Sequence, residues 1–164
     1  MSNVIYLKLT GEKQGLISEG CSNINSNGHR LYLSHDNEIF ICKLINTLSL
    51  EKDDPFRHID IIKPIDKSTP LLVNALNGKE RLLCEFLFYR TAEYGRNELY
   101  FKLTLENAIL TDIRFSYPNS LLNMDCHPQE SVSFAYSSAT LEHVKGQTRS
   151  LPMRNEIVQQ SDYI

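Results

Sequence analysis

The sequence has no tryptophan, no long apolar run and no surplus of positive charge. No window approaches the roughly 20 consecutive apolar residues that a bilayer-spanning helix needs, so membrane insertion is not expected. The segment from Met1 to Lys8 lacks a basic stretch followed by a long apolar one, and we therefore expect no signal peptide. These absences predict a protein that is made and folded in the cytoplasm and that needs a dedicated machine if it leaves the cell.

Charge and size limit the class of protein further. Lys and Arg together number 17, and Asp and Glu number 20, which gives a formal net charge of −3. Nucleic-acid-binding domains usually carry a basic surplus, so the composition argues against a nucleic acid as partner. The 164 residues favour one domain. A domain of this size buries about 70% of its unfolded surface, and it needs no metal or disulfide to fold.

The residue spacings that mark catalytic, phosphate-binding or metal-binding sites are also missing. There is no glycine-rich phosphate loop and no G-x-S-x-G motif. The five histidines do not show the paired spacing of a zinc site. The cysteines form no C-x-x-C pair, and we expect free thiols at Cys21, Cys42, Cys84 and Cys126. The sequence therefore predicts a protein that is not an enzyme, with no catalytic residue, metal or cofactor.

What the sequence contains instead is alternation of apolar and polar residues. From Leu99 to Glu106 every second residue is a leucine or a phenylalanine. A period of two indicates a strand with one buried face. On this basis we predict strands at residues 3–10, 31–33, 39–45, 59–65, 82–89, 99–106, 109–117 and 131–144.

One helix is predicted after the strand that Pro64 ends. Ser68 or Thr69 can cap its first turn, in which Pro70 is well tolerated. Gly78 stands where a left-handed stop is expected. The apolar side chains fall on one narrow face, which is typical of a helix that lies on a sheet: Leu71, Leu72, Ala75 and Leu76.

Seven or eight strands and one helix predict a mainly β fold: a two-sheet β-barrel or sandwich with one short α-helix on its side. Some strands are apolar on both faces, as Leu83, Leu87 and Tyr89 show opposite Phe86 and Phe88. A free-standing barrel needs only one buried face. The second apolar face indicates either a second layer or a surface that a partner covers.

Two segments lack such alternation. Residues 146–164 have no sustained pattern and are interpreted as a short C-terminal tail, partly disordered, with one turn of helix near residues 155–159. Residues 46–58 form a polar loop, and loops longer than about 12 residues are often functional. A solvated connector is the alternative for that loop. The centre of the loop is Glu51, Lys52, Asp53, Asp54 and Pro55.

The run from Lys63 to Leu72 opens the predicted helix, and the aromatic-Tyr-Arg strand Phe88–Thr91 follows it. With residues 4–9, 14–22, 102–108 and 130–134, these segments resemble in order and spacing the Hcp family (hemolysin-coregulated protein), the tube protein of bacterial type VI secretion systems. The segments are spread over most of residues 3–144. The resemblance implies an Hcp-like tube domain over residues 1–145, followed by the tail at 146–164.

The resemblance also implies an assembly. Members of the family look like a β-barrel of two sheets with a helix on one side, and they form hexameric rings that stack into a hollow tube. A contractile sheath drives the tube, tipped by a spike of the VgrG type, and effector proteins can travel in the lumen. By this resemblance the chain is a structural subunit secreted without a signal peptide. The loop at Glu51, Lys52, Asp53, Asp54 and Pro55 then contacts the next ring.

Two other functions stay open from the sequence. The chain can be a specialised secreted effector or carrier, whose C-terminal tail docks a toxin or once preceded one. Nineteen residues from Gly146 to Ile164 are too few for an enzyme of their own, because domains below about 40 residues usually need added crosslinks. A monomeric ligand-binding barrel is the third possibility.

Overall fold

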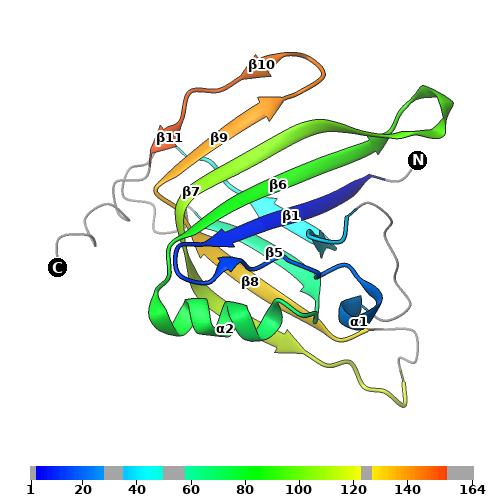
Figure 1. Cartoon of the computed structure of the whole chain (residues 1–164), viewed down its shortest axis with the longest axis vertical. Helices are drawn as coiled ribbons and strands as arrows, with labels where there is room; N and C mark the ends of the chain where they lie inside the picture. Colours follow the sequence, from blue (N-terminus) through cyan, green and yellow to red (C-terminus); the bar gives the residue numbers. More distant parts are fainter. Residues whose placement is uncertain (1–2, 28–34, 50–57, 123–126, 155–164) are drawn as a thin grey trace.

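The computed structural model describes residues 3–27, 35–49, 58–122 and 127–154, which form two layers of antiparallel strands with the helix α2 packed against them (Figure 1). The helices are α1 (Ile24–Asn27), α2 (Thr69–Gly78) and the 3-10 turn η1 (Glu93–Gly95). The strands are β1 (Val4–Gly11), β2 (Gly15–Leu16), β3 (Ile39–Ile41), β4 (Lys43–Asn46), β5 (His58–Pro64), β6 (Leu82–Thr91), β7 (Asn97–Ser116), β8 (Gln129–Ala135), β9 (Ser138–His143), β10 (Thr148–Arg149) and β11 (Met153–Arg154). The predicted mainly β fold is confirmed.

The hydrogen-bonded path runs β2-β1-β6-β7-β8-β5-β4, and β7 belongs to both layers. We call the layer of β1, β2, β3, β6, β9, β10, β11 and the first half of β7 sheet A. Sheet B consists of β4, β5, β8 and the second half of β7. The predicted strand at 39–45 is broken at Cys42, so that β3 pairs with β1 and β4 with β5. The barrel is therefore not closed by a continuous ladder in the described residues.

β7 is one strand of 20 residues, whereas the sequence predicts two strands at 99–106 and 109–117. Asn107 has a φ of 49°, and the pairing with β8 shifts register between Leu110 and Asp112. Such irregularities bend a strand without ending it. The bend takes β7 from sheet A, where it pairs with β6, into sheet B, where it pairs with β8. The predicted strand at 131–144 is conversely two strands, β8 and β9.

The core lies between the two sheets and follows the predicted alternation. In β6, Cys84 and Phe86 are fully buried while Leu83 stays 39% exposed. Phe86 of sheet A meets Phe134 of sheet B edge to face, with ring centroids 6.4 Å apart. Burying a side chain of this kind contributes about 1.5–3 kcal/mol. The inner faces of the two sheets are thus the main source of stability.

Helix α2 covers the same core with Leu72 and Ala75, which are buried as predicted. Its end differs from the prediction: the left-handed residue is Lys79, with a φ of 47°, and not Gly78. The Glu80 N–H donates to the Ala75 carbonyl at 3.0 Å, which fixes this turn whatever the side chain at residue 79. Ser68 stands at the N-cap, but its side chain makes no capping bond to the helix.

Part of the predicted tail belongs to sheet A, because β10 and β11 pair with β9. The predicted helical turn at 155–159 and the predicted strand at 31–33 lie outside the described residues. The domain division at residue 145 stays a prediction. In the described part of the chain, no helix combines the length and the apolar character needed to cross a membrane.

Candidate assembly surfaces

In the part of the chain that the structure describes, sheet B ends in an open edge on each side. Within the described residues, β4 pairs only with β5, and the stretch Ile109–Ser116 of β7 pairs only with β8. Helix α2 packs against β7, but its buried residues join the core cluster of Leu110, so it covers the inner face and leaves the ladder edge unpaired. Unpaired edges are templates for another strand. Sheet B can therefore be extended at both ends.

The outer face of sheet B is mostly polar and carries both signs of charge. Rows of paired residues line a shallow hollow of about 300 Å³: Lys43, Ile45, Asp60, Ile62, Asp112, Arg114, Ser131 and Ser133. The Ser133 hydroxyl donates to Asp60 Oδ1 at 2.5 Å, and His58 Nε2 lies 3.2 Å from Asp60 Oδ2. Serine and histidine both contact the aspartate here, whereas a nucleophilic triad needs the serine on the histidine. These contacts are therefore not those of a nucleophilic triad.

The apolar residues on the outer face of sheet A are partly covered by another segment of the same chain. The His35 ring stacks on Tyr6 with centroids 4.0 Å apart, and Tyr89 packs edge-on against both rings. Burial, with the nearby Glu38 carboxylate, raises the pKa of Tyr89. The chain's own segment at residues 35–38 therefore forms a second layer over this end. Leu83 remains exposed beyond it.

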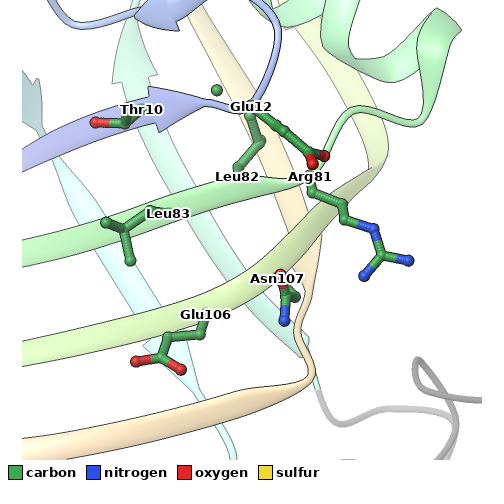
Figure 2. Close-up of a pocket in the computed structure, with 8 residues that line it drawn as sticks. Thr10, Glu12, Arg81, Leu82, Leu83, Glu106 and Asn107 are labelled. Atoms are coloured by element: carbon green, nitrogen blue, oxygen red, sulfur yellow. The ribbon is translucent and has the colours of Figure 1, made fainter.

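A second hollow, of about 360 Å³, opens beside Leu83 where β1, β6 and β7 meet. Figure 2 shows its lining side chains spread around the opening, with the Glu106 carboxylate and the Arg81 guanidinium on opposite sides. Small-molecule sites bring a few polar groups together on one spot. These groups do not converge, so the hollow does not have the geometry of a small-molecule site.

A buried ionic cluster holds the start of α2 on sheet B. The Lys63 ammonium donates to Asp66 Oδ1 at 3.0 Å and to Glu130 Oε1, and all three side chains are at most 1% exposed. Asp66 Oδ1 also accepts from the Ser68 N–H and hydroxyl, and the Thr69 hydroxyl donates to Glu130 Oε1 at 3.0 Å. The cluster joins β5, β8 and α2 and so fixes the helix relative to sheet B.

Free thiols are found at Cys21 and Cys84, and Cys126 lies outside the described residues. Burial, helped by the Asp66 carboxylate, raises the pKa of the Cys21 thiol to about 12. Burial alone raises the pKa of Cys84. Neither thiol is therefore a nucleophile at neutral pH. Among the described residues there is no group of three or more metal-binding side chains.

Glu80 fastens the turn after β1 to the end of α2. The residue is 4% exposed, and its carboxylate accepts from the Lys13 and Gln14 N–H groups at 2.5 and 2.7 Å, and from the Gln14 side-chain amide at 2.5 Å. Burial by itself favours the neutral acid, but these hydrogen bonds outweigh it, so the pKa of Glu80 is lowered. The ionised form therefore stabilises the fold.

Glu80→Gln is expected to lower the free energy of unfolding by about 1.5–3 kcal/mol at neutral pH, the range for hydrogen bonds to a charged group. Because the folded pKa lies below the ordinary 4.5, this contribution is complete above that pH and is lost as the pH falls below it. Urea unfolding from pH 3 to pH 7, with the exposed Glu12→Gln as control, measures the difference. A deficit that grows towards acid pH contradicts the assignment.

A profile of the family described as "Type VI secretion system effector, Hcp" matches residues 6–143. The chain belongs to the Hcp family. The Major exported protein of Pseudomonas aeruginosa is 30% identical over 170 residues, which cover 96% of this chain and 99% of that protein. The uncharacterised protein YhhZ of Escherichia coli K12 is 36% identical over 149 residues. That match covers 90% of this chain and 37% of YhhZ, so the chain spans little more than a third of this relative's length.

Solved Hcp structures share the fold. The crystal structure of an Hcp protein superposes with a TM-score of 0.85 at 30% identity, covering 94% of this chain and 98% of that one. The secreted protein Hcp3 from Pseudomonas aeruginosa gives a TM-score of 0.82 at 29% identity, covering 93% and 98%. The predicted Hcp resemblance is confirmed. Membership supports a role as a secreted tube protein of the type VI secretion system, and the structural character of Hcp favours a non-catalytic one.

The residues that the sequence places at the Hcp ring contact lie in segment 50–57, outside the described residues: Glu51, Lys52, Asp53, Asp54 and Pro55. The flanking strands show where the loop starts and returns, because β4 ends at Asn46 and β5 begins at His58. These strands are neighbours in sheet B. The cluster around Lys63 and Glu130 was not predicted from the sequence, although a lysine on the same strand face as Ile59 and Ile61 was a usable signal.

Proposed function

We propose that this Hcp chain is a structural subunit of the type VI inner tube, in which copies form hexameric rings that stack and are secreted. The observation that supports this most is the pair of open edges on sheet B. If β4 of one copy lies beside β7 of the next, the contact is head-to-tail, and repeated rotation closes it into a ring. Closure also removes the hazard of two exposed sheet edges.

The position of sheet A suggests which face of sheet B lines the lumen of the ring. Sheet A and α2 lie on one side of sheet B (Figure 1). In a closed ring the thicker side takes the larger outer circumference, so the bare polar face of sheet B faces the lumen. That face has two basic and two acidic side chains, which suits many weak contacts with an effector protein more than binding of nucleic acid: Lys43, Arg114, Asp60 and Asp112.

The remaining partners follow from the tube itself. A spike of the VgrG type contacts the end of the stack, and a contractile sheath surrounds its outer wall. Both belong to the proposal through the family and not through particular residues.

Molar mass in solution tests the proposal. Light scattering is expected to give about six times 18.9 kDa, and negative-stain micrographs should show annular particles. A protein that stays at 18.9 kDa at high micromolar concentration contradicts the ring and favours a monomeric ligand-binding barrel.

The stacking role of the loop gives a separate prediction. Deletion of Glu51 to Pro55 should leave rings intact and reduce stacking, because the deletion shortens the loop that we propose contacts the next ring and spares both strands of sheet B. Tube length in micrographs is the measurement, and a deletion at the tip of the β6–β7 hairpin, residues 93–95, is the control. Tubes of normal length from the loop deletion contradict the stacking role.

A second candidate is a specialised effector or carrier, whose C-terminal tail docks a toxin or once preceded one. The match to YhhZ favours keeping it, because the matched region makes up only 37% of that protein. Truncation after Arg154 separates the two functions. A tube subunit should assemble and be secreted normally without residues 155–164, whereas a carrier should lose toxicity or a bound partner.

A further inference from the structure

The outer edge of β9 is occupied by a segment that follows the family match. β9 pairs with β7 on one side. On its other side β10 pairs with its end and β11 with its beginning, in the register Thr148↔His143, Arg149↔Glu142, Met153↔Ala139 and Arg154↔Ser138. The match to the Hcp profile ends at residue 143, before this segment starts. Figure 1 shows β10 and β11 lying along β9 at the rim of sheet A.

Between β10 and β11, two hydrogen bonds of Ser150 continue the pairing with β9. The Ser150 N–H donates to the Leu141 carbonyl at 2.9 Å, and the Leu141 N–H donates to the Ser150 hydroxyl oxygen at 3.0 Å. The segment is folded back by a tight turn, in which the Gly146 N–H donates to His143 Nδ1 at 2.8 Å. Gln147 adopts a φ of 56° there. The backbone of β9 is thus covered over most of its length.

The covering segment is itself a poor template for a further strand. β10 and β11 have two residues each, and Leu151 and Pro152 interrupt them. Between the pairs Arg149↔Glu142 and Met153↔Ala139, three residues of the segment face two of β9, which is a β-bulge, and Leu151 within it is 88% exposed. Pro152 has no N–H to offer, and Arg149 adds an exposed charge. Short strands, bulges, proline and charge are the devices by which proteins protect sheet edges.

We propose that residues 146–154 are an edge guard, which occupies the β9 edge of sheet A and prevents copies of the chain from pairing there. Without it, the six residues of β9 present an open edge, the first half of which carries small side chains: Ser138, Ala139 and Thr140. Strand addition between two copies then becomes possible. With it, the β9 edge is occupied while both edges of sheet B stay open in the described residues, and in this respect the inference rests on the proposed ring.

Two truncations test the guard. Removal of residues 146–164 is expected to yield species of at least about twice the molar mass of the full-chain assembly, because one new edge contact joins two assemblies. Removal of residues 155–164 alone is the matched control and should leave the mass unchanged. Light scattering measures both across a range of concentrations. Equal masses for a folded 1–145 chain and the full chain overturn the proposal.

A point variant keeps the test independent of chain length. Ser150→Pro removes both the N–H and the hydroxyl that bond Leu141, and it should raise the mass as the longer truncation does. Ser150→Ala removes only the hydroxyl and should have a smaller effect. If the 1–145 chain does not fold, unchanged mass of Ser150→Pro overturns the proposal. A full chain that is monomeric would contradict the ring but not the guard, which then predicts dimers of the variants.

Discussion

Replacement of Lys63 by methionine is expected to lower the free energy of unfolding by about 3–5 kcal/mol, because it leaves two buried carboxylates without their counter-charge. The Asp66 and Glu130 side chains are at most 1% exposed, so water cannot take over the role of the ammonium. Glu130 Oε2 already lacks a hydrogen-bond partner within the described residues. Because the cluster fixes α2 on sheet B, the variant should also lose assembly at lower temperature than the wild type.

Urea unfolding followed by circular dichroism measures this effect, and Lys102→Met is the matched control. The Lys102 ammonium lies 3.2 Å from Glu85 Oε1, but both side chains are partly exposed on the outer face of sheet A. A surface pair of this kind contributes about 0–1 kcal/mol. If Lys63→Met destabilises the fold no more than Lys102→Met does, the buried cluster does not hold the helix in place.

Replacement of Phe115 by alanine is expected to weaken ring formation. Phe115 lies on the open edge of β7 and is 46% exposed, whereas Glu130, its partner in β8, is buried. Truncation of an aromatic hot spot at an interface costs at least about 2 kcal/mol, or roughly 30-fold in affinity. The loss applies at every contact around the ring. The variant should therefore dissociate at concentrations where the wild type stays assembled.

Tyr94→Ala is the control for Phe115→Ala. Tyr94 is 97% exposed in the β6–β7 hairpin, away from both edges of sheet B. Sedimentation velocity over a dilution series gives the assembly of each variant, and circular dichroism verifies that each is folded. Equal dissociation of the two variants, or none in Phe115→Ala, would show that the β7 edge is not an interface.

Strands with strict alternation could be predicted from the sequence because their burial pattern is local. The run at 82–89 and the run at 99–106 both became strands with the expected buried faces, Leu103 and Leu105 among them. Pro70 and the apolar face of α2 were local signals too. The bend that keeps β7 one strand depends on its pairing with β6 and β8, and the left-handed Lys79 depends on the hydrogen bonds after α2. Neither the pairing of β7 with two strands nor the hydrogen bonds after α2 has a recognisable sequence pattern.

The assembly surfaces were less accessible from the sequence than the fold. Which strand edges are open depends on the order of the strands in the sheet. The order β7-β8-β5-β4 cannot be predicted from the sequence of any single strand. The family resemblance directed attention to the loop at residues 51–55, which stays a prediction. The edge guard could not be predicted because residues 146–154 show no alternation of apolar and polar residues. Their pairing with β9 depends on backbone hydrogen bonds and on Ser150.

Amide hydrogen exchange of the assembled protein tests most directly whether the edges of sheet B meet between copies. Peptides covering Lys43–Asn46 and Ile109–Ser116 should exchange slowly at concentrations where rings form, and faster after dilution to protomers, because their outward amides then lose their partners. A peptide covering residues 92–96 should exchange rapidly throughout. Equal exchange of the two edge peptides in the assembled and the diluted protein would contradict the ring contact.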